Sequence, residues 1–270
     1  MSDRADINKL VDVMRALRDP NAGCPWDLQQ DASSLARYTL EEAYEVVDAI
    51  DSHDMQQLKQ ELGDLLFQVV FHSSIASENG FFTLQQVVDT IVEKLIRRHP
   101  HVFPVEGQVA SRNVDDIRSA WEQMKAQERK EKGAGQLLDD IPMALPAMQR
   151  AQKIQSRLAT IGFDWTAPEP VLAQLQLEIE ELVQVMHANE QDAVAEEMGD
   201  VLFSCVNLAR HLHCDPESVL RAANNKVLAR LNWMEQHLSA AGEMLSEQST
   251  DRLEHLWQQA KRALSGTAVD

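Results

Sequence analysis

The chain is dominated by an internal repeat, in which one acidic pattern occurs twice. Four acids of the first half reappear 136 positions later, because 178 − 42 and 200 − 64 both equal 136. Their neighbours repeat as well, since ELGDLLF at 61–67 aligns with EMGDVLF at 197–203. A repeat of this kind indicates two copies of one folding unit. The paired acids are Glu42 with Glu178, Glu45 with Glu181, Glu61 with Glu197, and Asp64 with Asp200.

Basic and aromatic residues extend the repeat toward the end of each copy. Two pairs keep the spacing of 136 and two have a spacing of 132, so the loops between them differ by four residues. We expect one module at 1–125, a charged and then Gly- and Pro-rich linker at 126–146, and a second module at 147–270. The pairs are Trp121 with Trp257, Lys125 with Lys261, Lys94 with Lys226, and Arg98 with Arg230.

Apolar residues recur at helical spacing along most of the chain. Leu58, Leu62, Leu65 and Val69, for example, form a stripe one turn apart on one face. Aromatic residues make up only 5%, Gly and Pro number 10 and 9, and no convincing pair of strands is present. These features disfavour a β fold. The sequence therefore predicts an all-α protein of two repeated helical-bundle modules.

The spacing of the acids predicts a metal site. Glu42 and Glu45 are three residues apart, as are Glu61 and Asp64, so each pair shares one helical face. The short link 51–54 predicts a helical hairpin that brings the two pairs together. Carboxylates without nearby thiols suit Mg²⁺, with Mn²⁺ possible. The second module repeats the pattern with Glu178, Glu181, Glu197 and Asp200.

A solvated acidic surface is the alternative interpretation of these carboxylates. A single ExxE or ExxD pair in an acidic protein is typical of such a surface. Here all four acids repeat with Gly and Phe beside them, which favours a site. Leu62, Leu66 and Val69 lie on one flank of the second helix and Phe71 on another, so we expect that helix to be buried. Ionised acids there would need a cation to compensate them.

The overall charge restricts the partners. The formal net charge is −18 and the pI is about 4.8, which argues against binding to nucleic acid or to a membrane surface. An anionic substrate would then need a bridging divalent cation. The start Met1–Arg4 lacks an apolar signal, and the three cysteines form no CxxC pair. We expect a cytoplasmic protein with buried, reduced thiols.

Cationic and aromatic residues are the candidates for binding a metal-bound polyphosphate. Each pair Lys94–Arg98 and Lys226–Arg230 lies on one helical face, four residues apart, and each module has a Lys one turn after a Trp. The tryptophans could stack on a base or anchor a terminal helix. The histidines at 99, 101, 211 and 213 do not repeat, and we interpret them as structural or surface residues. The substrate-binding candidates are Lys226, Arg230, Trp257, Lys261, Lys94, Arg98, Trp121 and Lys125.

Several motifs together resemble the MazG family. They are Glu41-Glu42-Ala43-Tyr44-Glu45 followed by Glu61-Leu62-Gly63-Asp64, then Cys24-Pro25-Trp26-Asp27, and Arg97-Arg98-His99-Pro100-His101-Val102-Phe103. The resemblance covers nearly the whole chain, including its tandem arrangement. It implies an all-α NTP pyrophosphohydrolase: a Mg²⁺-dependent homodimer that hydrolyses nucleoside triphosphates of broad base range, ATP included, to monophosphate and pyrophosphate.

The resemblance also implies residue roles. In tandem members the C-terminal module is usually credited with catalysis, so Glu178, Glu181, Glu197 and Asp200 would hold Mg²⁺, while Lys226, Arg230, Trp257 and Lys261 would contact nucleotide. The sequence departs from the pattern at one position. The first Glu of EExxE is Glu41 in the first module but Leu177 in the second. Glu41 is therefore a further catalytic candidate for orienting water, and both modules remain candidate sites.

Two rival functions are compatible with the sequence. One is a non-catalytic nucleotide sensor or helical interaction protein, a role that the first module alone could have while the second works. The other is a pyrophosphatase narrowed to one nucleotide, such as dUTP or phosphoribosyl-ATP. Turnover would separate the first rival from the enzyme, and a nucleotide panel would separate the second.

Overall fold

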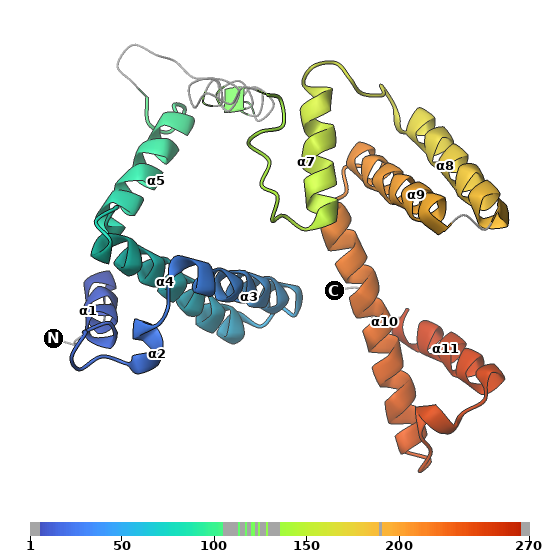
Figure 1. Cartoon of the computed structure of the whole chain (residues 1–270). Helices are drawn as coiled ribbons and strands as arrows, with labels where there is room; N and C mark the ends of the chain where they lie inside the picture. The colour runs from blue at the N-terminus through green and yellow to red at the C-terminus, as the bar shows by residue number, and fades with distance from the viewer. Residues whose placement is uncertain are drawn as a thin grey trace. The chain divides into compact units, whose positions relative to one another are not determined.

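The computed structural model describes residues 6–104, 136–188 and 191–265, together with 113, 117, 120, 121, 124 and 128. The chain divides into two compact units, Met1–Ala126 (unit 1) and Gln127–Asp270 (unit 2). All regular secondary structure in these described residues is helical, as Figure 1 shows, so the predicted all-α class is confirmed. None of the described helices is long and apolar enough to cross a membrane.

Capping side chains set the starts of all the helices described in unit 1 except α2 (Pro25–Leu28). The described helices are α1 (Ile7–Leu17), α2, α3 (Ala32–Asp51), α4 (Met55–Glu78) and α5 (Leu84–Arg98). Asp31 accepts a hydrogen bond from the Ser34 amide and completes a capping box at α3, while Asp54 caps α4. Only Ser52, His53 and Asp54 separate α3 from α4, and the two helices pack side by side as the predicted hairpin.

The core of unit 1 lies at one end of this hairpin. Met14 of α1 and Leu35 of α3 pack there against Val70, Phe71 and Ile75 of α4. Burial of each such side chain contributes about 1.5–3 kcal/mol to folding. This core joins α1, α3 and α4, and it leaves the acidic middle of the hairpin outside the apolar cluster.

Unit 2 repeats the hairpin and adds a second helix pair. Its elements are α7 (Ala147–Ala159), α8 (Pro168–Ala188), α9 (Gln191–His211), α10 (Pro216–Ser239), a 3-10 turn (Leu245–Glu247) and α11 (Thr250–Leu264). Helix α8 packs on α9, and α7 packs on α9 and α10. Helices α10 and α11 form their own small core from Met234, Leu238, Leu256 and Ala260.

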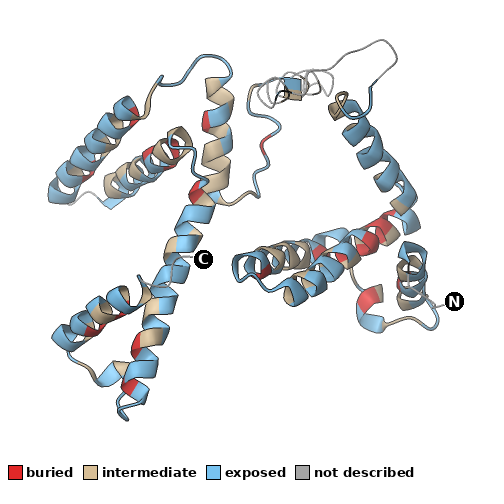
Figure 2. Cartoon of the chain, turned by 180° about the vertical axis from the view of Figure 1, so that it is seen from behind, coloured by how far each residue is buried: buried red, intermediate tan, exposed pale blue. Residues whose placement is uncertain are grey.

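The expected burial of α4 is wrong for the single chain. Leu62, Leu66 and Val69 are 49%, 44% and 39% exposed, although Phe71 is fully buried, and Figure 2 shows pale exposed positions along the hairpin. Within unit 1, α4 contacts α1, α3 and α5, and these neighbours leave its outer face uncovered. Free Cys205 and Cys214 are also exposed rather than buried. The apolar stripe was correctly placed on the helix, but a single chain does not cover it.

Candidate functional site

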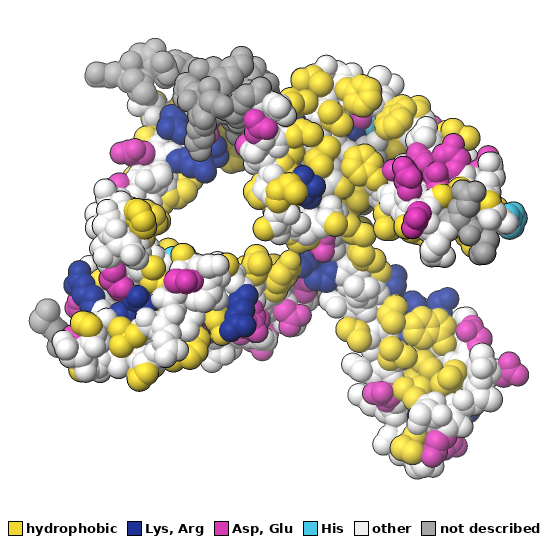
Figure 3. All heavy atoms as spheres, in the orientation of Figure 1, with side chains coloured by type: hydrophobic (Ala, Val, Ile, Leu, Met, Phe, Trp, Pro, Cys, Tyr) yellow, Lys and Arg dark blue, Asp and Glu magenta, His cyan; other side chains and the backbone are white. Residues whose placement is uncertain are grey.

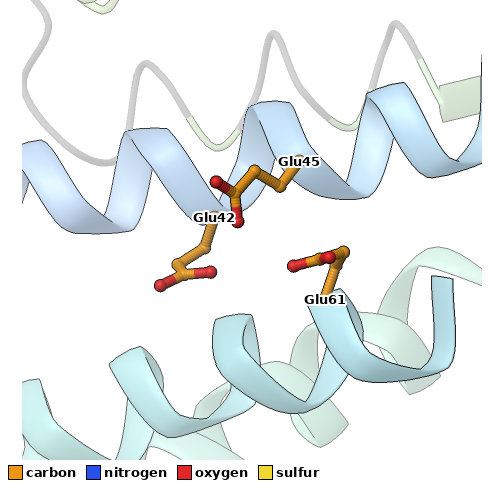
Figure 4. Close-up of side chains that lie close together, drawn as sticks. All are labelled: Glu42, Glu45 and Glu61. Carbon is orange, nitrogen blue, oxygen red and sulfur yellow. The ribbon is translucent and has the colours of Figure 1, made fainter. Parts of the chain in front are cut away.

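In unit 1 the hairpin gathers three carboxylates. Glu42 and Glu45 extend from α3 and Glu61 from α4, and one oxygen of each lies within 4.8 Å of the others. Figure 4 shows these three side chains meeting in the space between the two helices. The fourth expected member, Asp64, is exposed and lies outside this group.

Unit 2 gathers a different set of three. Oxygens of Glu178 on α8 and of Glu197 and Asp200 on α9 all lie within 4.8 Å of one another. Glu181 is exposed and lies outside the group. In Figure 3, acidic side chains gather over the α8–α9 part of the unit. Each unit therefore assembles three of its four repeated acids, but not the three equivalent ones.

The crowding of these acids changes their protonation. Partial desolvation between the helices, followed by the charges of Asp64, Glu61 and Glu41, raises the pKa of Glu42 above its ordinary value. Desolvation and then Glu61 raise the pKa of Glu45. In unit 2 desolvation raises the pKa of Glu197, with the charges of Glu181, Asp200, Glu178 and Glu196 adding to it. Negative charges so close together favour proton uptake or a bound cation.

The donor chemistry of both groups fits a hard divalent cation. Every ligand in the two groups is a carboxylate oxygen, which Mg²⁺ and Mn²⁺ prefer over thiol or imidazole ligands. The acids are half-buried or exposed rather than deeply buried. Our expectation that deep burial makes a cation obligatory is therefore wrong, and mutual repulsion is the stronger argument for a cation. The half-open position also leaves these carboxylates accessible to solvent.

The cationic candidates of unit 2 lie on other helices. Lys226 and Arg230 belong to α10, and Trp257 and Lys261 belong to α11, which packs on α10. The Arg230 guanidinium lies over the Trp257 ring at 5.1 Å, and Trp257 packs against the α10–α11 core. Within 136–188 and 191–265 no ion pair joins these cations to the acids on α8 and α9. Trp257 thus anchors α11, and its stacking on a base stays a prediction.

The candidates of unit 1 show the same anchoring. Lys94 and Arg98 lie on α5. The Trp121 indole N–H donates to the Arg98 carbonyl at 2.8 Å, and its ring packs edge-on against His99. This contact favours an anchoring role for Trp121. Lys125 lies outside the described residues.

Two glutamines beside the acids were not among the sequence candidates. Gln174 Nε2 donates to Glu178 Oε1 at 2.8 Å, and the Gln68 side chain lies beside Glu42, where it lowers the pKa of that carboxyl against the causes that raise it. Gln174 could have been found, because it lies four residues before Glu178 on one helix. Gln68 lies on the opposite helix from Glu42, so only the fold reveals its contact.

The position of the water-orienting candidate Glu41 is exposed in both units. Glu41 lies on the solvent side of α3 next to Glu42, and Leu177 occupies the corresponding exposed position on α8. Glu41 adds negative charge near Glu42 and Glu45. Unit 2 has no acid at this position, so the two sites differ in charge as well as in grouping.

Comparisons with known proteins agree with the repeat. The MazG nucleotide pyrophosphohydrolase domain matches twice, at residues 30–103 and 166–234. The chain is 45% identical over 258 residues to a nucleoside triphosphate pyrophosphohydrolase of Escherichia coli, covering 95% of this chain and 97% of that protein. It is 42% identical over 255 residues to the nucleoside triphosphate pyrophosphohydrolase/pyrophosphatase MazG of Thermotoga maritima, covering 94% and 95%.

A solved structure is also similar over part of the chain. A mazG-related protein from Thermotoga maritima matches with 24% identity and a TM-score of 0.37. The match covers 44% of this chain and 98% of that protein.

Proposed function

This chain belongs to the MazG nucleotide pyrophosphohydrolase family, and from this premise we propose that it hydrolyses nucleoside triphosphates to monophosphates and pyrophosphate. The reaction depends on Mg²⁺ and accepts a broad range of bases, ATP included. The observation that carries the proposal is the group of Glu178, Glu197 and Asp200, whose oxygens lie within 4.8 Å of one another. The anionic protein needs a cation to hold an anionic substrate.

Unit 2 is assigned the chemistry, as its resemblance to tandem members implies. Glu178, Glu197 and Asp200 would hold the cation, with Glu181 beside them. When bound, Mg²⁺ supplies charge neutralisation and polarisation of the triphosphate. The bond between the α-phosphorus and its bridging oxygen breaks as water adds, which releases pyrophosphate. A carboxylate of this quartet accepts the proton that the water loses.

Cationic residues provide the remaining contacts to the phosphates. Lys226 and Arg230, with Lys261, would stabilise the negative charge that develops on the departing oxygens. They belong to the α10–α11 pair, whereas the acids belong to α8 and α9. A complete site therefore needs Lys and Arg side chains near the acids, and in the described part of one chain no ion pair joins the two sets of residues.

A homodimer is the second part of the proposal. Leu62 and Leu66 on α4 are exposed, and so are Met198 and Leu202 at the matching positions of α9. Contiguous exposed apolar faces of this kind mark interaction surfaces. Because the same apolar face is exposed in both repeats, a second copy of this chain is a better candidate to cover it than a protein that recognises only one unit. Sedimentation analysis tests this: the native chain should form dimers, and Leu66→Glu with Leu202→Glu should yield monomers.

Product analysis with ATP tests the catalytic proposal. With Mg²⁺ the expected products are AMP and pyrophosphate, and chelation of the cation should stop the reaction. A panel of ribo- and deoxynucleotides measures the substrate range under the same conditions. ADP and inorganic phosphate as products would contradict the proposed reaction, and turnover of a single nucleotide would contradict the broad range.

A further inference from the structure

A glutamine side chain lies beside the first acid of each quartet. In unit 2, Gln174 Nε2 donates to Glu178 Oε1 at 2.8 Å, and both side chains are half-buried. In unit 1, the buried Gln68 side chain lies beside Glu42 and lowers the pKa of that carboxyl, against the desolvation and the neighbouring charges that raise it. The shared feature is a glutamine side chain next to the first acid of the quartet.

The two glutamines are not equivalent in the repeat. The position that matches Gln174 in unit 1 is Tyr38, and the position that matches Gln68 in unit 2 is Ser204. Gln174 reaches its carboxylate along one helix, whereas Gln68 reaches across from α4 to α3. Both quartets therefore have a glutamine neighbour, which comes from a different position in each unit. A contact that recurs without its residue being repeated is more easily explained by a requirement of the carboxylate than by the duplication itself.

Packing alone does not explain Gln68. Its side chain is only 6% exposed, and its Oε1 is buried with no hydrogen-bond partner among the described residues. Burial of an unpaired carbonyl oxygen destabilises the fold. An apolar residue at position 68 would avoid this destabilisation, but it would leave Glu42 without the amide.

We propose that Gln174 is a positioning residue for the hydrolysis in unit 2, holding Glu178 toward Glu197 and Asp200, and that Gln68 does the same for Glu42 in unit 1. This inference rests on the proposed function. Like charges push the carboxylates apart, and a fixed amide donor holds one of them in place before a cation arrives. The carboxylate keeps its remaining lone pairs for that cation. Hydrogen bonds to metal-holding side chains act in this way in other metal sites.

The test measures cation binding in the absence of nucleotide. Full-length Glu61→Ala, which removes one acid of the unit 1 group, is titrated with Mn²⁺ by calorimetry and electron paramagnetic resonance, with and without Gln174→Met. We expect Gln174→Met to weaken Mn²⁺ binding by about 10-fold or more. Gln176→Met is the matched control, because it makes the same substitution at an exposed glutamine two residues further along α8. It should leave the affinity unchanged.

Kinetics separate positioning from a merely structural role. For Gln174→Met the Mg²⁺ concentration at half-maximal rate should rise by about 10-fold, while kcat at saturating Mg²⁺ returns to within about threefold of the parent. Unchanged Mn²⁺ affinity would overturn the inference. So would an equal loss in Gln176→Met, or a kcat loss that added Mg²⁺ does not restore. If the proposed function is wrong, the parent protein itself will release no pyrophosphate. The Mn²⁺ affinities of the variants can still be compared in that case.

The reciprocal experiment examines unit 1. In a Glu197→Ala background, Gln68→Met should weaken the remaining Mn²⁺ binding by about 10-fold, and thermal unfolding shows whether the variant is folded. Gln68→Glu is the second variant, because it keeps the shape but replaces the donor by an acceptor. Weaker binding in both variants supports the inference. Native affinity in both of them would overturn it for unit 1.

Discussion

The two units carry the same acids on the same helix pair, yet they assemble them differently. Unit 1 gathers Glu42, Glu45 and Glu61, with two acids from the first helix. Unit 2 gathers its three with two acids, Glu197 and Asp200, from the second helix. The repeat thus determines which helix faces meet, while neighbouring side chains decide which carboxylates come together. Two copies of one motif need not have the same activity.

The first and largest test of this comparison removes one acid from each unit. We expect Glu197→Ala to lower the rate of pyrophosphate release by more than about 100-fold, because it removes a cation ligand. Glu61→Ala, at the matching position of unit 1, should change the rate by less than about threefold. Glu196→Ala, a change at an adjacent exposed acid, is the control for charge alone. A loss of only about twofold in each single variant, with hydrolysis abolished in the double variant, would mean that both units catalyse.

Ion pairs stabilise the same end of both hairpins but use unrelated positions. In unit 1, Arg18 pairs with Glu78 at 2.6 Å and also donates to the Asp27 carbonyl. In unit 2, Arg210 of α9 pairs with Asp164 at 2.5 Å, and His211 joins the same carboxylate. Both arginines are largely buried, so each pair ties a loop or helix end to the hairpin.

The second test therefore concerns stability. Arg18→Met should lower the free energy of unfolding by about 2 kcal/mol, because Glu78 loses its partner. Arg15→Met is the control, since its pair with Asp12 is highly exposed and should contribute less than about 0.5 kcal/mol. Urea unfolding measures both values. If Arg18→Met also stopped hydrolysis while the protein stayed folded, the assignment of catalysis to unit 2 would be contradicted.

The hairpins and the acids on their facing sides could be predicted from the sequence. The link at 51–54 and the three-residue spacing of Glu42 and Glu45 suffice, because both depend on local geometry. The partners of Arg18 and Gln68 could not be predicted, since these contacts join residues that are distant in the chain or on opposite helices. The choice of three acids from four depends on side-chain rotamers, which a repeat pattern does not contain.

Protonation offers a third and smaller test. The pKa is raised for two acids of the unit 1 group, Glu42 and Glu45, and for Glu197 in unit 2. Protons compete with a cation for these groups, so cation binding weakens as pH falls toward and through the raised pKa. Mn²⁺ affinity should therefore drop more between about pH 7.5 and about pH 5.5 for unit 1, measured in Glu197→Ala, than for unit 2, measured in Glu61→Ala. Equal pH dependence would contradict the electrostatic difference between the units.

Cation binding becomes stronger as pH rises, but the fold of the cation-free protein becomes less stable over the same range. A carboxyl whose pKa is raised by folding binds protons more tightly in the folded than in the unfolded state. Its destabilising contribution is absent at low pH and grows as pH rises from the ordinary glutamate range through the raised pKa. Added Mg²⁺ should offset this contribution, so its effect on Tm should be larger at neutral than at acidic pH.

The smallest expected effect concerns the repeated glycines. Gly63 and Gly199 lie within helices, and an added Cβ at either would meet no atom within 4 Å in the chain. Alanine should therefore stabilise the monomeric chain by about 0.5–1 kcal/mol. If a second copy approaches these faces as proposed, Gly199→Ala should also raise the dimer dissociation constant. An unchanged dimer dissociation constant would mean that this face of α9 is not part of the dimer interface.

The most direct measurement is a crystal structure of the full chain with Mn²⁺ and a non-hydrolysable triphosphate, using anomalous scattering. We predict a peak within about 2.3 Å of oxygens from Glu178, Glu197 and Asp200, with a phosphate oxygen completing the coordination. The absence of a peak there, with these three carboxylates turned apart into solvent despite bound nucleotide, would contradict the account.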